Sequence, residues 1–209
     1  IRDIGVTGVQ TCALPICIDY LNEKGVLVTA GHSAATYKEA THAFDHGVPA
    51  VTHLWNAMSP LHHRDVGLPG AAFNHDAVCA SIIVDGIHSD FETVKISKEL
   101  MGERLFLITD AVAKCDKGIY QHVFNEDHYT MPDGTLSGSA LTMLKAVENC
   151  VEKVGISLEE SLRMATLYPA RLFGRHDLGN LNSGSIANVL VFDQDFQVQQ
   201  VVFQGKRII

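Results

Sequence analysis

The sequence has no run of about 18 apolar residues, so it predicts no helix that spans a membrane. No segment shows the charged start, apolar middle and small-residue cleavage site of a secretory signal. Lysine and arginine number 16 against 24 acidic residues, and the resulting net charge of −8 disfavours nucleic acid, whose phosphates need clustered basic side chains. We therefore expect a cytoplasmic globular protein that binds neither membranes nor nucleic acid.

Cysteine is scarce and irregularly placed. The chain has five cysteines, none in CxxC spacing, which argues against a disulfide framework and favours a reducing compartment. The simplest interpretation is a set of free thiols without a functional role. Histidine is abundant by contrast, with 11 residues, and several of them end apolar runs beside Gly, Thr or Asp. Metal or catalytic chemistry uses histidine at such places.

Four short apolar runs that end in small or polar residues dominate the first half of the chain. They are Val26–Ser33, Ala50–Asn56, Cys79–His88 and Leu105–Val112. Helix-like stretches over 35–45 and 91–101 follow the first and third runs. This alternation predicts an α/β fold with a parallel sheet. Because a (β/α)8 TIM barrel needs eight such units, we predict its C-terminal half, with a complete four-stranded open sheet as the alternative.

The second half begins with a turn-rich segment, Tyr129–Ala140, which we expect to be a loop. A helix over about 141–154 follows, and then a second helix with Ser157 as its N-cap and Glu160 at the capping-box position. Residues 184–209 predict two strands around a turn, which we interpret as strands of a small β-sandwich domain. The barrel part then covers 18–183, and 1–17 is a separate segment.

Polar residues at the ends of the apolar runs are the first candidates for chemistry. His32 and His53 follow consecutive predicted strands, so their imidazoles are expected to converge and to suit Zn²⁺ or a similar divalent ion. Asp110 ends the run LFLIT, where a carboxylate is suited to take a proton from water and pass it to a leaving group. Structural histidines and a salt-bridged structural aspartate are the alternatives.

Weaker candidates lie in the segments that follow these strands. The loop after His53 carries Asn56, Ala57 and Arg64, which would hold a polar or anionic group, and His88 would donate to a substrate oxygen or phosphate. The segment LSGS, which includes Leu136, Ser137 and Gly138, precedes a helix and would meet an anion there. A solvent-exposed arginine, a helix-start histidine and an ordinary helix cap are the alternatives.

Taken in order, these segments resemble the N-acetylglucosamine-6-phosphate deacetylase family of the amidohydrolase superfamily. The resemblance rests on GHSAATYKEATHAFDHGVPAVTHLWNAMSPLHHR, VDGIHSD, LITDAV, GTLSGSALTM and MATLYPARLFG. It runs from about Ile18 to the end of the chain. The ensemble in this order and spacing is specific, whereas GHS or LSGS alone is not.

The resemblance implies a role for each candidate. The metal-ligand histidines are matched by His32 and His53, and the catalytic aspartate by Asp110. Arg64 matches a phosphate-binding arginine that, in this family, reaches across a homodimer interface. The residues that match substrate contacts are Asn56, Ala57, His88, Leu136, Ser137 and Gly138. The implied partner is a small-molecule amino-sugar phosphate, N-acetyl-D-glucosamine 6-phosphate, hydrolysed in amino-sugar catabolism to D-glucosamine 6-phosphate and acetate. The implied cofactor is a divalent metal ion, Zn²⁺ foremost, with Fe²⁺ and Co²⁺ as alternatives.

The chain also departs from that family. The family's metal-binding glutamate has no counterpart here, and residues 1–17 instead resemble the translation of a sequencing-library adaptor from Val6 onward. We therefore expect a non-native segment over 1–17 and little or no deacetylase activity from these 209 residues alone. Two other functions stay open: a different amidohydrolase-superfamily deacetylase, and a non-catalytic barrel that binds sugar phosphates.

Overall fold

The computed structural model describes residues 14–118 and 121–209. Residues 1–13, most of the segment that the sequence predicts to be non-native, lie outside the described residues. The described chain forms two compact units. The first comprises the residues up to Ile83 together with Ile96–Phe106, and the second comprises Val84–Lys95 and Leu107–Ile209.

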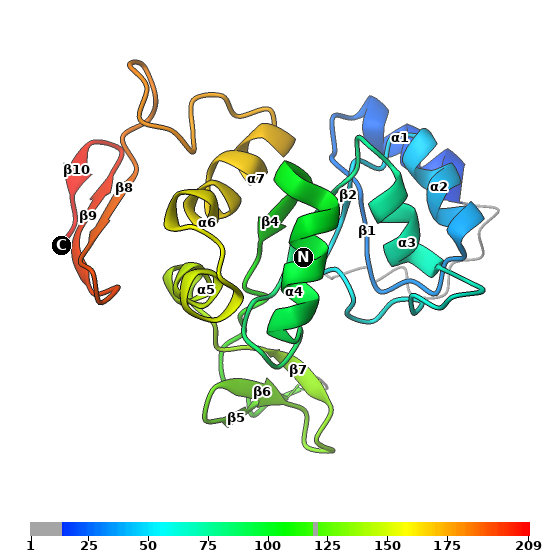
Figure 1. Cartoon of the computed structure of the whole chain (residues 1–209), viewed down its shortest axis with the longest axis horizontal. Helices are drawn as coiled ribbons and strands as arrows, with labels where there is room; N and C mark the ends of the chain where they lie inside the picture. The colour runs from blue at the N-terminus through cyan, green and yellow to red at the C-terminus, as the bar shows by residue number, and fades with distance from the viewer. Residues whose placement is uncertain (1–13, 119–120) are drawn as a thin grey trace. The chain divides into compact units, whose positions relative to one another are not determined.

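A four-stranded sheet organises the first unit (Figure 1). Its strands are β1 (Thr29–Ala30), β2 (Ala50–Val51), β3 (Cys79–Ile82) and β4 (Leu105–Leu107), in the order β1-β2-β3-β4. β1 pairs with β2, and β2 with β3, in parallel. All four predicted runs therefore supply a strand to one sheet, and the predicted α/β class is confirmed. Each run is longer than its strand, because its last residues form the loop that follows and, in the first run, residues 26–28 precede the strand.

The helices around this sheet are α1 (Leu14–Glu23), α2 (Tyr37–Asp45) and α3 (Gly67–Asn74), with α4 (Phe91–Met101) and the 3₁₀ turn η1 (Gly102–Arg104) leading into β4. α2 contacts both α1 and α3, and α4 contributes residues to both units (Figure 1). α2 starts at a complete capping box between Thr36 and Glu39, which explains its sharp beginning. The predicted helix over 91–101 agrees with α4 at both ends.

Helix α3, whose sequence is GLPGAAFN, was not expected from the sequence. Two glycines and a proline give this segment poor helix propensity, so burial rather than propensity sustains it. Its residues 67–72 are all buried. A Cβ at Gly70 would lie 2.4 Å from Cβ of Val66, so only glycine fits there. Arg104 caps the C-terminal end of α3, because its guanidinium donates to the carbonyl oxygens of Ala72, at 3.0 Å, and Phe73, at 3.2 Å.

The second unit combines a small antiparallel sheet with a group of helices. The sheet consists of β5 (Val123–Asn125), β6 (His128–Thr130) and β7 (Leu136–Ser139). The expectation of a loop over Tyr129–Ala140 is wrong, because most of this segment is a β-hairpin. Its turn closes with the Met131 carbonyl accepting from the Gly134 amide at 2.9 Å. The turn signals Pro132, Asp133 and Gly134 suggested irregular chain, although they connect two strands.

Three helices follow β7. They are α5 (Met143–Asn149) with a π-helical turn at Cys150–Val154, α6 (Leu158–Ala165) and α7 (Leu167–Leu172). The predicted helix over 141–154 is confirmed, apart from its π-helical last turn. The Ser157 hydroxyl accepts from the Glu160 amide at 3.3 Å, which confirms the predicted N-cap of α6. In the described residues, no helix is long and apolar enough to cross a membrane.

The end of the chain forms a third sheet, also in the second unit. Its strands are β8 (Val189–Phe192), β9 (Val198–Phe203) and β10 (Lys206–Arg207), all antiparallel in the order β10-β9-β8. The sequence predicted two strands here, and the structure adds a short third one. Membership of a β-sandwich stays a prediction.

Candidate active site

His32 and His53 lie side by side where β1 and β2 end. Ala30 pairs with Val51 across the two strands, and each histidine stands two residues beyond that pair. The ring centroids are 4.7 Å apart, in an edge-to-face arrangement. His53 is 4% exposed, whereas His32 is exposed. The rings converge as the sequence predicts, while their role as metal ligands stays a prediction.

The third strand fixes the position of His53. The His53 backbone amide donates to the Ser81 hydroxyl at 2.8 Å, and the Leu54 amide donates to the Ser81 carbonyl at 2.7 Å. Ser81 is 2% exposed and lies within β3. Because both bonds are buried, β3 holds the turn that carries the imidazole. Ser81 was not predicted from the sequence, although a serine inside the apolar run CASIIV was a usable signal.

The loop after His53 supplies the next predicted residues. The Asn56 side-chain amide donates to the Leu54 carbonyl at 3.3 Å, so it folds back onto its own loop. Ala57 is exposed. The Arg64 guanidinium is exposed and donates to Nε2 of His63 at 3.0 Å. This geometry is compatible with both an anion-binding arginine and a solvent-exposed one.

Asp110 follows β4 and is held by β7. The Asp110 carbonyl accepts from the Ser139 amide at 3.0 Å, and the Val112 amide donates to the Ser139 carbonyl at 3.1 Å. Gly138 permits this close approach, because a Cβ there would lie 2.7 Å from Cγ1 of Val112, and its φ is +147°. The structure thus brings the LSGS segment beside the predicted catalytic aspartate. The prediction that Leu136, Ser137 and Gly138 form a loop before a helix is wrong, since they belong to β7.

His88 is locked to Asp85 within the second unit. The Nδ1 of His88 lies 2.5 Å from Oδ2 of Asp85, and the two side chains are only 6% and 5% exposed. Oδ1 of Asp85 accepts from the backbone amides of Ile87, at 2.9 Å, and His88, at 2.8 Å. Burial raises the pKa of Asp85, but these hydrogen bonds and the His88 charge together outweigh burial and hold that pKa below its usual value.

This pair has a chemical consequence for His88. A carboxylate only accepts hydrogen bonds, so Nδ1 carries the hydrogen and Nε2 is left to meet another group. Asp85 was not among the candidates predicted from the sequence, although it lies at the end of the apolar part of the run Cys79–His88. Its contact with His88, three residues later, makes it a positioning residue for that imidazole.

Backbone strain singles out the same segments. Eight non-glycine residues in the described chain have a positive φ. Five of these follow β1, β2 or β4: His32, His53, Trp55, Ala57 and Asp110. The other three lie in the tight turns of the antiparallel sheets: Glu126, Phe196 and Gln204. Left-handed backbone costs about 1–3 kcal/mol in such residues and persists only where the surrounding structure enforces it, and such residues cluster at active sites. The strain therefore supports the strand ends as the functional region.

The histidine pair fits part of a metal site. Two imidazoles at this separation suit two ligand positions of a divalent transition metal. Across 14–118 and 121–209, no group of three or more His, Cys, Asp or Glu side chains is arranged to hold an ion. Catalytic zinc usually has three protein ligands, so His32 and His53 are a partial ligand set within the described chain.

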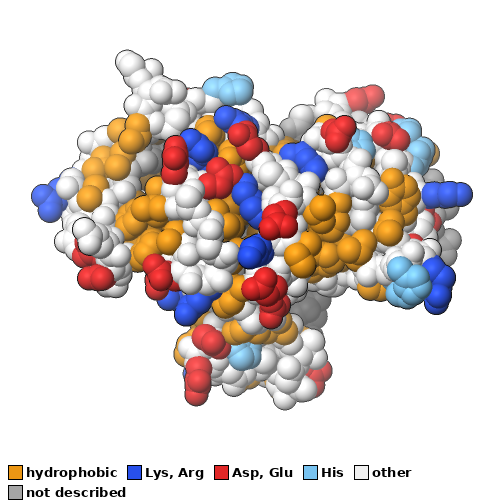
Figure 2. Space-filling view, in the orientation of Figure 1, with side chains coloured by type: hydrophobic (Ala, Val, Ile, Leu, Met, Phe, Trp, Pro, Cys, Tyr) orange, Lys and Arg blue, Asp and Glu red, His pale blue; other side chains and the backbone are white. Residues whose placement is uncertain are grey.

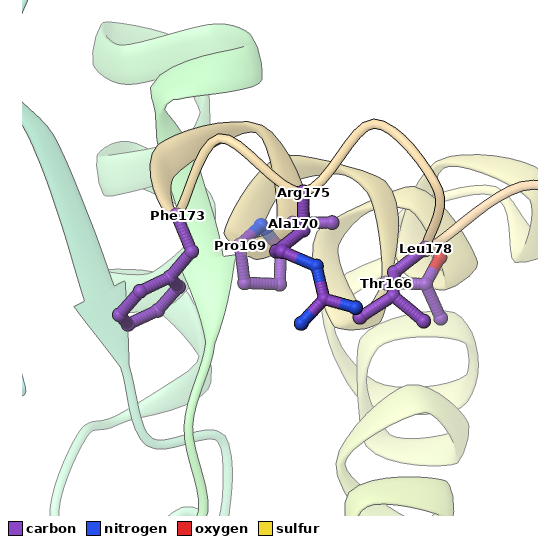
Figure 3. A pocket seen from close by; sticks show the side chains of 6 residues that line it. All are labelled: Thr166, Pro169, Ala170, Phe173, Arg175 and Leu178. Carbon is purple, nitrogen blue, oxygen red and sulfur yellow. The ribbon is translucent and has the colours of Figure 1, made fainter. Parts of the chain in front are cut away.

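A separate pocket of the second unit contains none of these residues. Figure 3 shows the six residues that line it: Thr166, Pro169, Ala170, Phe173, Arg175 and Leu178. Arg175 already forms a two-bond ion pair with Asp177, at 2.8 and 2.9 Å. Because its charge is paired and most of the lining is apolar, we assign this pocket no part in the candidate chemistry.

Comparison with known proteins shows extensive similarity to one family. A model described as "Amidohydrolase family" matches residues 11–208. An N-acetylglucosamine-6-phosphate deacetylase from Haemophilus influenzae is 39% identical over 196 residues, which cover 87% of this chain and 50% of that protein. An N-acetylgalactosamine-6-phosphate deacetylase from Escherichia coli O157:H7 is 34% identical, over 90% of this chain and 52% of that protein. The chain thus spans about half the length of the curated relatives that it matches.

Solved structures agree with this picture. The crystal structure of an N-acetylglucosamine-6-phosphate deacetylase from Pasteurella multocida superposes with a TM-score of 0.88 at 38% identity, covering 92% of this chain and 53% of that one. A variant of the Mycobacterium smegmatis N-acetyl-D-glucosamine-6-phosphate deacetylase, solved in complex with N-acetyl-D-glucosamine-6-phosphate, gives 0.88 at 29% identity, covering 95% and 55%. The α/β fold therefore matches that of these enzymes.

Proposed function

Since the chain belongs to the amidohydrolase family, whose members generally depend on divalent metal ions, we propose that it carries part of the catalytic site of an N-acetylglucosamine-6-phosphate deacetylase. The reaction is hydrolysis of the acetamide of N-acetyl-D-glucosamine 6-phosphate to D-glucosamine 6-phosphate and acetate. The observation that carries the proposal is the convergence of His32 and His53 at the ends of adjacent parallel strands, 4.7 Å apart between ring centroids.

His32 and His53 would hold the divalent ion, Zn²⁺ foremost, with its other ligands coming from outside the described residues. When bound, such an ion polarises a carbonyl and lowers the pKa of water. Asp110 accepts a proton from the water that attacks the acetamide carbon. It then returns a proton to the nitrogen as the carbon–nitrogen bond breaks, because an unprotonated amine leaves poorly. The backbone of Asp110 is left-handed, with φ at +49°, a strained conformation that is enriched at active sites.

Other residues would bind the sugar phosphate away from the breaking bond. Asn56 and Ala57 contact the sugar from the loop after His53. His88 meets a substrate oxygen through Nε2, because Asp85 occupies Nδ1. Leu136, Ser137 and Gly138 approach the substrate from β7, beside Asp110. These contacts position the acetamide and supply binding energy.

The phosphate is assigned to Arg64. In a homodimer, its exposed guanidinium would reach the site of the neighbouring subunit. Its fork of donors suits a phosphate. The remaining architecture follows from the same proposal: the sheet order β1-β2-β3-β4 supports half of a (β/α)8 barrel over 18–183, and the three-stranded sheet supports part of a small β-sandwich over 184–209.

The sugar is the part of the proposal with a specific rival. The 34% identical relative named N-acetylgalactosamine-6-phosphate deacetylase favours a substrate that differs only in the orientation of one hydroxyl. The roles proposed for the metal ion, Asp110 and Arg64 are the same for either sugar. The contacts of Asn56 and His88 would then decide between the two.

A hybrid enzyme tests the function. The matching half of the Haemophilus influenzae relative is replaced by residues 18–209, and acetate release is followed with Zn²⁺ present. We expect turnover of N-acetylglucosamine 6-phosphate well above that of unphosphorylated N-acetylglucosamine, and little or no turnover by the 209-residue chain alone. Equal rates on the two sugars would remove the phosphate assignment. A preference for N-acetylgalactosamine 6-phosphate would change the sugar and leave the reaction in place.

A further inference from the structure

A second pair of histidines lies on α2, away from the candidate active site. His42 and His46 are one helical turn apart, so their side chains leave the same face. Their ring centroids are 4.1 Å apart, with the ring planes tilted by 54°. His42 is exposed and His46 is half-buried, so solvent reaches the pair.

A hydrogen bond to the helix backbone holds the ring of His46. Its Nδ1 lies 2.7 Å from the carbonyl oxygen of His42. Because a carbonyl oxygen only accepts, Nδ1 carries the hydrogen, and Nε2 keeps its lone pair for another partner. Histidines that bind metals typically donate their other ring nitrogen in this way, which fixes both the tautomer and the ring orientation.

The surroundings of the pair also favour a cation. α2 ends at Asp45, and the carbonyl end of a helix carries partial negative charge. The Asp45 carboxylate is 61% exposed and lies 3.6 Å from Nε2 of His75. Figure 2 shows histidine side chains beside acidic ones over α2.

The place of the pair in the fold separates it from His32 and His53. Those two histidines follow the ends of β1 and β2. The pair on α2 instead precedes β2, which starts at Ala50. A helix that returns the chain to the start of the next parallel strand ends at the opposite edge of the sheet. The two histidine pairs therefore belong to opposite edges.

We propose that His42 and His46 form a binding site for a divalent first-row transition metal ion. Two imidazoles at i and i+4 of a helix are a recognised bidentate arrangement, and water completes the coordination. Affinity follows the general order for nitrogen ligands, with Cu²⁺ above Zn²⁺ and Ni²⁺. The proposal does not depend on the proposed function.

Copper titration of the full 209-residue chain tests the site. Calorimetry with Cu²⁺ is carried out on a His32→Gln/His53→Gln background, so that the other pair does not contribute. His42→Gln and His46→Gln each remove one ring while keeping a polar, helix-compatible side chain. His62→Gln is the matched control, because it removes one ring from a pair that is also 4.1 Å apart but adjacent in sequence.

We expect His42→Gln and His46→Gln each to raise the Kd of one Cu²⁺ site by about tenfold or more, since bidentate binding is lost. The control should leave that Kd unchanged. Equal Kd values in all three variants would overturn the proposal. If the background variant does not fold, NMR of the unmutated chain decides. Broadening by substoichiometric Cu²⁺ should then affect the ring resonances of His42 and His46 together, and broadening that spares both would also overturn the proposal.

Discussion

Replacing Asp85 by asparagine tests the buried pair with His88 at almost constant shape. The carboxylate accepts two backbone amides through Oδ1 and the His88 ring through Oδ2. Asparagine can keep the two backbone bonds through its carbonyl oxygen. Its NH2 group then faces Nδ1 of His88, so one of the two groups must give up its role as donor. We expect His88 to shift its hydrogen to Nε2.

The loss of stability in Asp85→Asn follows from the hydrogen bond to His88 that the variant loses. A hydrogen bond to a charged group contributes about 1.5–3 kcal/mol, and this one lies between side chains that are 5% and 6% exposed. We therefore expect Asp85→Asn to lower the free energy of unfolding by about 2 kcal/mol at pH 7. Because the folded-state pKa of Asp85 is lowered, its stabilisation is complete above the unfolded value of about 4 and disappears as the pH falls through the folded-state value.

Urea unfolding at pH 7 and at acidic pH measures this difference, and ¹⁵N NMR of the imidazole reports the tautomer of His88. Asp127→Asn is the matched control, because Asp127 faces Nδ1 of His128 at 2.8 Å but is 73% exposed. We expect that control to cost less than about 0.5 kcal/mol. A loss at Asp85 no larger than the control's, or an unchanged tautomer, would refute the argument.

Three further variants test other parts of the account. Arg104→Met removes at least four hydrogen bonds from the guanidinium to carbonyl oxygens, and should lower the free energy of unfolding in urea by about 3–5 kcal/mol. The control Arg163→Met, at an exposed arginine, should lower it by less than about 1 kcal/mol. Similar losses in the two variants would contradict the role given to Arg104. Gly138→Ala should lower the free energy of unfolding by about 2–4 kcal/mol in the same measurement, because of backbone strain at this positive φ and a clash of the new Cβ with Val112. An unchanged free energy of unfolding would show that β7 does not need to approach Val112 so closely. Ser81→Ala should cost about 1–3 kcal/mol, because it leaves the buried His53 amide without its acceptor, and an unchanged His53 amide resonance would contradict that bond.

Periodicity predicted the fold best where hydrophobic pattern and local signals agree. All four apolar runs entered one sheet, and the helix over 91–101 ended where predicted. α3 escaped prediction because tertiary burial, rather than propensity, sustains a segment with two glycines and a proline. The hairpin that contains β7 was missed for a related reason. Gly138 weakens the strand signal, yet the close approach to Val112 requires glycine there.

The candidate site was predictable to the extent that strand ends identify it. The sequence indicated His32 and His53, because parallel strands place their ends at one edge. Ser81 was not found, since its contact with the His53 amide depends on the register of β2 and β3. The role of Asp85 was likewise not found, because a tight turn rather than a periodic element brings its carboxylate to His88.

Replacing Asp110 by asparagine in the hybrid enzyme, with acetate release as the assay, tests whether this residue transfers the proton. Asparagine keeps the size of the side chain but cannot accept and return a proton in the catalytic step. We expect kcat on N-acetylglucosamine 6-phosphate to fall about 10²–10⁴-fold while KM changes little. A kcat within a few-fold of the unmodified hybrid would contradict the assignment of Asp110 as the proton-transferring residue, and with it the proposed mechanism.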